Sequence, residues 1–186
     1  IYLRRIYMKL LIISDIHGSS YYAKMIPEIF KLEKADGIII LGDLYYHGPR
    51  NPLPKDYSPM DVCNILNSLK EKLKVVRGNC DALVDETISD FNFHDHLLLT
   101  INNKRIYFTH GDKYNQDVLP DEKFDIMFYG HFHTGFIRKK NNLIFANPGS
   151  ISLPKNNTRH SYIIMDSEKI TLKDISGSII EETYLN

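Results

Sequence analysis

The sequence predicts an α/β protein in which two β-sheets pack face to face, flanked by helices. Apolar runs and helical patterns alternate in the first half, which is typical of a parallel sheet with right-handed crossovers. In the second half, short strand patterns flank Asn102-Asn103 and Asn141-Asn142, which are good hairpin turns. We therefore expect the first sheet to begin parallel and the second to be largely antiparallel.

The first half supplies the parallel strands. Its predicted elements are a strand over 9–14, a helix over 19–34, a strand over 37–41, a helix over 60–73 and a short strand over 74–77. The strand over 9–14 is continuously apolar, as a strand buried on both faces should be. Pro27 fits the helix over 19–34 only if it lies in a first turn, because proline lacks the N–H that helical bonding needs.

The second half supplies hairpins and a meander. The predicted strands cover 97–101, 105–109, 125–129, 136–138, 143–146, 160–165, 169–174 and 178–183. The last three resemble an antiparallel meander. We predict a single domain over 8–186, with residues 1–7 as an N-terminal extension of no assigned function, because Met8 resembles a natural start.

Composition narrows the function classes. Lysine plus arginine equals aspartate plus glutamate at 23 each, so the net charge is zero and a general nucleic-acid binder is disfavoured. Two cysteines indicate a reducing compartment. Since no apolar run could span a membrane and the start lacks a complete signal peptide, we expect a cytoplasmic protein. A symmetric homo-oligomer is the base-rate expectation.

Polar side chains follow five predicted strands, in loops that contain glycine. They are Asp15 and His17, Asp43, Asn79, His110, and His131 with His133. Taken singly, most of these residues also fit turn, helix-cap or half-buried positions. Because sites in open α/β sheets form at the carboxyl ends of strands, we expect the seven side chains to meet in one cleft.

The ligand types point to a metal centre. Mixed carboxylate, imidazole and amide donors suit Mn²⁺, Fe or Zn²⁺ better than Ca²⁺ or a thiolate-bound structural zinc. Seven donors exceed what one ion needs if positions are to stay open for water. Two ions that share a bridging carboxylate account for the number.

The motif series resembles that of the calcineurin-like metallophosphoesterases. The matching segments are Asp15-x-His17, Gly42-Asp43, Gly78-Asn79, His110 and Gly130-His131-x-His133. The segments Gly42–Asn51, Arg77–Asp81 and Asn147–Pro154 are most similar to the YfcE-type phosphodiesterases. The resemblance covers the chain from Met8 onward. It implies a four-layer αββα sandwich and a phosphodiester hydrolase that uses two divalent ions, Mn²⁺ first, with Zn²⁺, Fe or Ni²⁺ as alternatives.

The resemblance also implies a role for each site residue. One ion is held by Asp15, His17 and His133, and the other by Asn79, His110 and His131, while Asp43 bridges both. A hydroxide between the ions attacks phosphorus in line with the leaving alkoxide, so no side-chain base is needed. Asp43 and Asn79 are therefore catalytic candidates, and Asn79 is also a candidate contact for the substrate.

Two positions depart from the pattern of many relatives. Cys80 stands where many of them have a histidine that can protonate the leaving group. A thiol is a poor substitute, so we expect a preference for diesters with good leaving groups. Cys80 is thus either a catalytic residue or a small packing residue. Asp112 replaces another histidine and could orient a ligand histidine or cap a turn.

Arg50 lies in the long polar loop that follows Asp43. Its planar guanidinium suits a phosphate, so it is a candidate for substrate binding, although a solvated loop arginine fits as well. The predicted function is hydrolysis of a small or nucleotide-like phosphodiester. The alternatives are a nuclease of the same superfamily and a non-catalytic scaffold resembling the retromer subunit with this fold.

Overall fold

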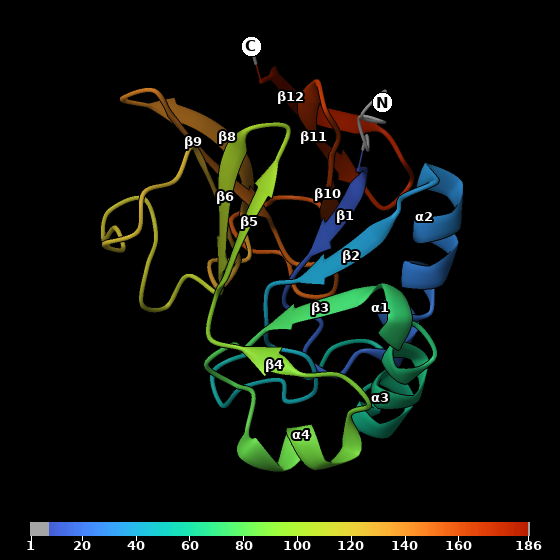
Figure 1. The fold of residues 1–186 in the computed structure, drawn as a ribbon. Coiled ribbons are helices and arrows are strands. Elements are labelled where there is room, and N and C mark those ends of the chain that lie inside the picture. The colour runs from blue at the N-terminus through green and yellow to red at the C-terminus, as the bar shows by residue number, and fades with distance from the viewer. Residues whose placement is uncertain (1–7, 186) are drawn as a thin grey trace, which may run out of the picture.

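Residues 8–185 are described by the computed structural model, and the predicted extension over 1–7 lies outside them. The strands of the described part form a seven-stranded and a five-stranded sheet. Figure 1 shows the two sheets facing each other, with helices beyond the seven-stranded one. The predicted two-sheet sandwich is therefore confirmed.

The seven-stranded sheet combines the parallel strands of the first half with the final meander. Its order is β12 (Ile179–Tyr184), β11 (Lys169–Asp174), β10 (Ser161–Met165), β1 (Leu10–Ile13), β2 (Gly37–Ile40), β3 (Leu73–Val76) and β4 (Phe93–His94). The strands from β1 to β4 pair in parallel, and β10 to β12 join β1 as an antiparallel meander. Both faces of β1 are buried: Leu10 and Ile12 pack between the sheets, whereas Leu11 and Ile13 pack toward the helices. Burial on both faces explains why this strand is apolar throughout.

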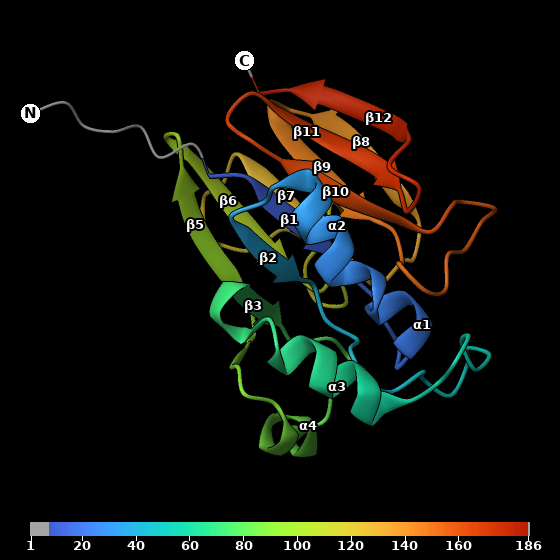
Figure 2. The same cartoon turned by 90° about the vertical axis from the view of Figure 1, so that its right-hand side faces the viewer.

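Helices cover the outer face of this sheet (Figure 2). They are α1 (Ser20–Ala23), α2 (Met25–Glu33) and α3 (Pro59–Asn67), and the short α4 (Leu83–Ile88) lies between β3 and β4 in the chain. The predicted helix over 19–34 is interrupted at Lys24, and Pro27 lies in the first turn of α2 as required. The interruption has a steric cause, because the Pro27 ring would clash with the carbonyl of Ala23 in a continuous helix.

The predicted helix over 60–73 is too long. It ends at Asn67, and a 3₁₀ turn (Lys70–Lys72) leads directly into β3. Leu73 continues the helical spacing of apolar residues but is buried as the first residue of the strand. Sequence reasoning did not predict α4 and β4.

The five-stranded sheet has the order β5 (Leu97–Ile101), β6 (Lys104–Thr109), β7 (Ile126–Tyr129), β9 (Leu143–Pro148) and β8 (Gly135–Lys140). Both hairpins are present, as predicted. The expectation of a largely antiparallel sheet is wrong, since β6 pairs in parallel with β7, and β7 in parallel with β9. The long segment over 110–125 provides the return crossover that a parallel pair requires.

The outer face of the second sheet carries aromatic residues rather than a helix. Tyr107, Tyr129 and Phe145 are buried there, and Phe124 from the segment over 110–125 packs on them. Figure 1 shows this segment in yellow outside the sheet. In residues 8–185 the helices thus lie between Ser20 and Ile88 only, so the expected outer helix layer on this side is replaced by a loop.

Candidate metal centre

The seven predicted ligands lie in loops that follow β1, β2, β3, β6 and β7. Parallel pairing within each sheet brings the carboxyl ends of β1, β2 and β3 together, and likewise those of β6 and β7. Because the sheets face each other, the five loops meet at one end of the sandwich. The structure therefore brings all seven side chains into one group.

The backbone at this site is unusual. Asp15, His17, Asp43, His131 and His133 all have a φ between 51° and 66°. This left-handed region is sparsely populated by residues other than glycine and costs about 1–3 kcal/mol at each position. Five neighbouring residues in this state indicate that the fold bends these loops to direct particular side chains inward.

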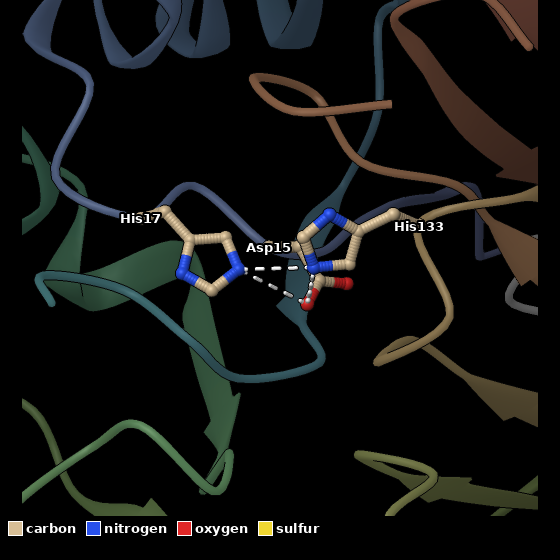
Figure 3. A group of neighbouring side chains, drawn as sticks. All are labelled: Asp15, His17 and His133. Atoms are coloured by element: carbon tan, nitrogen blue, oxygen red, sulfur yellow. Dashed lines mark hydrogen bonds and ion pairs between the residues drawn. The ribbon is translucent and has the colours of Figure 1, made fainter. Parts of the chain in front are cut away.

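One group of donors consists of Asp15, His17 and His133 (Figure 3). The Nε2 atoms of His17 and His133 lie 3.0 Å apart. Asp15 Oδ1 lies 3.6 Å from His17 Nε2 and 3.3 Å from His133 Nε2. Figure 3 shows the three side chains pointing toward one another.

Hydrogen bonding leaves these donor atoms free for a cation. His17 Nδ1 donates to the carbonyl of Tyr46 at 2.8 Å, and His133 Nδ1 donates to that of Leu153 at 2.6 Å. In the neutral rings the two Nε2 atoms then carry lone pairs that face each other. Asp15 Oδ1 is buried and has no hydrogen-bond partner in the described residues. Three buried acceptors around one point fit a divalent metal ion.

The second group consists of Asn79, His110 and His131. His110 Nε2 lies 3.0 Å from Asn79 Oδ1 and 3.2 Å from His131 Nδ1. His110 Nδ1 donates to the carbonyl of Leu41 at 2.6 Å, which turns the lone pair on Nε2 toward the site. This group therefore offers one amide oxygen and imidazole nitrogens, which also suit a divalent ion.

Asp43 lies between the two groups. Its Oδ2 is 3.6 Å from His17 Nε2 in the first group and 3.5 Å from His110 Nε2 in the second. Its Oδ1 accepts the backbone N–H of Cys80 at 2.8 Å, which holds the carboxylate in this orientation. One carboxylate oxygen is thus positioned to contact a cation in either group.

The electrostatics of the buried groups follow from these contacts. Burial raises the pKa of Asp15, but the close approach of the His133 and His17 rings outweighs it and holds the pKa well below its usual value. Burial lowers the pKa of His17 and of His110, yet nearby carboxylates, including Asp15 and Asp43, raise both overall. The carboxylates therefore attract positive charge to the site, as a proton or as a metal ion.

Asp81 is a site residue that sequence reasoning missed. Its carboxylate accepts the backbone N–H groups of Asp43, Leu44 and Gly78 at 2.7–2.9 Å. A Cβ on Gly78 would overlap the Asp43 carboxylate, so the two loops touch here. Asp81 thereby positions Asp43 relative to Asn79. The only sequence signal was an aspartate shortly after Asn79 in a tight loop.

The segment Asn147–Pro154 supports the first donor group. The hydroxyls of Ser150 and Ser152 donate to the carbonyl of Asp15 at 2.7 and 3.0 Å. The carbonyl of Leu153 holds His133, as described above. The sequence showed this segment only as part of the resemblance, whereas the structure shows that it orients Asp15 and His133.

A cleft of about 620 Å³ opens beside the seven residues. Asp43, Asn79, His131 and His133 line it, together with the predicted candidates Arg50 and Cys80. Tyr46, Phe132 and Lys155 also line it, and sequence reasoning did not single them out. The surroundings of a substrate thus include cationic and aromatic side chains beyond the predicted ligands.

The structure bears on the roles of Cys80 and Asp112, for which the sequence left two alternatives each. Burial, followed by the negative charge of Asp43, raises the pKa of the Cys80 thiol to about 12, so the thiol stays protonated at neutral pH. Asp112 is exposed, and the ring of His110 is oriented by the carbonyl of Leu41. The possibility that Asp112 orients this histidine is therefore not supported.

Comparisons with known proteins agree with this architecture. The family model described as calcineurin-like phosphoesterase superfamily domain matches residues 8–169. Phosphodiesterase YfcE of Escherichia coli K12 is 35% identical over 182 residues, which cover 96% of this chain and 99% of that protein. The solved structure of Escherichia coli YfcE superposes with a TM-score of 0.93 at 34% identity, covering 96% of this chain and 100% of that one.

A more distant structure shares the fold. Vacuolar protein sorting 29 of Cryptosporidium parvum has a TM-score of 0.66 at 18% identity, over 97% of this chain and 98% of that one. The family match and the near full-length similarity to YfcE confirm the prediction that the chain is an enzyme acting on phosphoesters. This chain belongs to the calcineurin-like phosphoesterase superfamily.

Proposed function

We propose that the protein is a phosphodiesterase that uses two divalent metal ions to hydrolyse a small or nucleotide-like phosphodiester. One observation carries the proposal: two groups of three nitrogen and oxygen donors are joined by Asp43 Oδ2, which lies about equally far from His17 Nε2 and His110 Nε2. Similarity to a named phosphodiesterase over almost the whole chain supports the choice of diesters.

Each residue of the site has a separate role in this proposal. Asp15, His17 and His133 would hold one ion, Asn79, His110 and His131 the other, and Asp43 both. Ions held there supply a hydroxide nucleophile at neutral pH and offset the charge of the phosphoryl oxygens. Asn79 would orient the phosphate under attack, and Arg50 would contact the substrate elsewhere in the cleft, because both residues line it. Mn²⁺ is the proposed metal, with Zn²⁺, Fe and Ni²⁺ as alternatives that fit the same donors.

The two alternative functions have less support. A nuclease would need a basic surface, and the net charge of the chain is zero. A non-catalytic scaffold would not need five strained residues to direct donor atoms at one another.

None of the helices in residues 8–185 is long and apolar enough to cross a membrane. The cytoplasmic location and the symmetric oligomer stay predictions.

The test combines metal analysis with hydrolysis of bis(p-nitrophenyl) phosphate. We expect about two divalent ions per chain by elemental analysis, and turnover that a chelator abolishes and Mn²⁺ restores. Asp43→Asn should lower both metal content and turnover, the latter by about 100-fold or more. Asp90→Asn is the matched control, because Asp90 pairs with Lys70 on the surface. Undiminished turnover in the chelator would overturn the two-ion proposal.

A further inference from the structure

The cleft beside the seven residues carries unmatched positive charge. Arg50 and Lys155 line it and are exposed, and neither forms an ion pair within residues 8–185. Among the described residues that line the cleft, Asp43 alone is acidic, and its carboxylate faces His17 and His110. Two divalent ions, the carboxylates of Asp15 and Asp43 and a hydroxide would together carry a charge of about +1, which the single negative charge of a diester phosphate balances. The charges of Arg50 and Lys155 therefore suit a second anionic group on the substrate.

Both residues start from segments of the main chain that lie at the cleft. The N–H of Lys155 donates to the carbonyl of His133 at 3.0 Å, so the base of this side chain is tied to a predicted ligand. Next to Arg50, the side chain of Asn51 donates to the carbonyl of His47 at 2.9 Å and closes the loop on itself. A bound anion would thus meet two cationic side chains that extend from the rim of this cleft.

The cleft also presents aromatic rings. Phe132 stands between His131 and His133 and is 46% exposed, and Tyr46 is 44% exposed. The Phe132 ring packs edge-on against His131 and Tyr129, with centroids 5.3 and 6.0 Å away, which fixes its position. Exposed rings at the mouth of a polar cleft favour a ligand with a planar ring that can stack on them.

We propose that the substrate is a nucleotide-like phosphodiester that carries a second phosphate. Arg50 and Lys155 bind that second phosphate, and the rings of Phe132 and Tyr46 contact the nucleobase. This inference rests on the proposed phosphodiesterase function and narrows its substrate class. It makes Lys155 and Phe132 specificity-determining residues.

The test compares two esters that differ only in the second phosphate: thymidine 5′-(p-nitrophenyl phosphate) and its 3′-phosphorylated form. For the Mn²⁺-loaded wild type we expect the 3′-phosphate to raise kcat/KM by about 10-fold or more. Lys155→Gln and Arg50→Gln should each reduce this ratio to below about threefold. Lys123→Gln, an exposed lysine outside the lining of the cleft, should keep the wild-type ratio.

The contact with the nucleobase is tested by comparing the thymidine ester with methyl p-nitrophenyl phosphate, a diester that lacks the nucleoside. Phe132→Leu should reduce the preference for the thymidine ester over the methyl ester, mainly through KM. Calorimetry gives a readout apart from turnover: thymidine 3′,5′-bisphosphate should bind more tightly than thymidine 5′-phosphate, and Lys155→Gln should remove the difference.

The outcomes separate this inference from the proposed function. Equal kcat/KM for the two thymidine esters, or a ratio that survives both charge substitutions, overturns the inference and leaves the phosphodiesterase intact. If Phe132→Leu leaves the preference for the thymidine ester over the methyl ester unchanged, the proposed contact of the Phe132 ring with the nucleobase is overturned. If the metal-loaded wild type hydrolyses none of the esters, the proposed function fails, and this inference fails with it.

Discussion

The carboxylate of Asp81 accepts the backbone N–H of Asp43, with 2.9 Å between Oδ2 and the amide nitrogen. The same carboxylate accepts the N–H groups of Leu44 and Gly78, so one half-buried side chain joins the loop after β2 to the loop after β3. Burial, with the negative charge of Asp43, raises the pKa of Asp81 to about 6. This half-buried carboxylate is destabilised in its charged form, and it positions Asp43, the residue that lies between the two donor groups.

We expect Asp81→Asn to weaken metal binding although Asp81 belongs to neither donor group. An amide has a single oxygen acceptor, so at least one of the three N–H groups loses its partner. The free energy of unfolding should fall by about 2 kcal/mol, and the affinity for Mn²⁺ by about 10–100-fold. Urea unfolding and calorimetric titration measure these effects, with Asp90→Asn as the control. Unchanged metal affinity would show that Asp81 does not position Asp43.

The protein should favour aryl diesters over alkyl monoesters. The thiol of Cys80 has a pKa raised to about 12 by burial and by Asp43, so it is a weak acid for protonating a leaving group. An alkyl alkoxide needs that proton, whereas p-nitrophenolate does not. We expect kcat/KM for bis(p-nitrophenyl) phosphate to exceed that for glycerol phosphate by about 100-fold or more. Faster hydrolysis of the alkyl monoester would contradict the prediction that the Cys80 thiol protonates leaving groups poorly.

Metal affinity should fall as the pH is lowered. His17 and His110 lose part of their basicity through burial, but neighbouring carboxylates raise their pKa overall, so the metal-free site holds protons that a metal ion must displace. Between pH 8 and pH 6 the affinity for Mn²⁺ should decrease and proton release on binding should increase. Calorimetric titrations in two buffers of different ionisation enthalpy measure both. An affinity independent of pH in this range would be inconsistent with protonated ligand histidines.

Glu33 should stabilise the packing of α2 on the first sheet in a pH-dependent way. Its carboxylate accepts the Tyr162 hydroxyl at 2.8 Å and the Lys173 ammonium at 2.6 Å. Burial raises the pKa of Glu33, but Lys173 and Tyr162 outweigh it and lower the pKa overall. A lowered pKa contributes stability above the unfolded-state value of about 4.3, and this stability is lost as the pH falls through the folded-state value.

Glu33→Gln should therefore lower the free energy of unfolding by about 1–2 kcal/mol at pH 7. The difference from wild type should shrink as the pH falls below about 4. Denaturant unfolding of the wild type and the variant, at pH 7 and below about pH 4, measures this difference in the free energy of unfolding. Glu28→Gln is the matched control, because Glu28 is exposed on the same helix. A difference that persists unchanged at low pH would show that Glu33 does not act through its charge.

Several features of the fold could be predicted because they depend on local sequence. The apolar run of β1 reflects burial on both faces, and Asn102-Asn103 forms the turn between β5 and β6, where both residues have a positive φ. The position of Pro27 in a first turn could also be predicted, because it follows from the geometry of proline, although sequence reasoning did not predict the break at Lys24 that produces this turn. Donor residues at strand ends were visible too, because parallel strands in one sheet end at a common edge.

Other features depend on contacts between distant segments. The spacing of Leu69 and Leu73 continues that of α3, yet Leu73 is buried in a strand. The parallel pairing of β6 with β7 depends on the path of the long segment between them, which no local pattern encodes. Lys155 lines the cleft only because the loop after β9 lies beside His133.

By itself, the sequence determined which residues could serve as donors and on which strand ends they stand, because both follow from residue chemistry and short-range periodicity. Tertiary structure decided which donor atoms face one another, that Asp43 lies between two groups, and that Asp81 holds it there. Those relationships are set by the pairing of strands and by hydrogen bonds between loops far apart in the chain. Their geometry is therefore a property of the packed molecule and of no single segment.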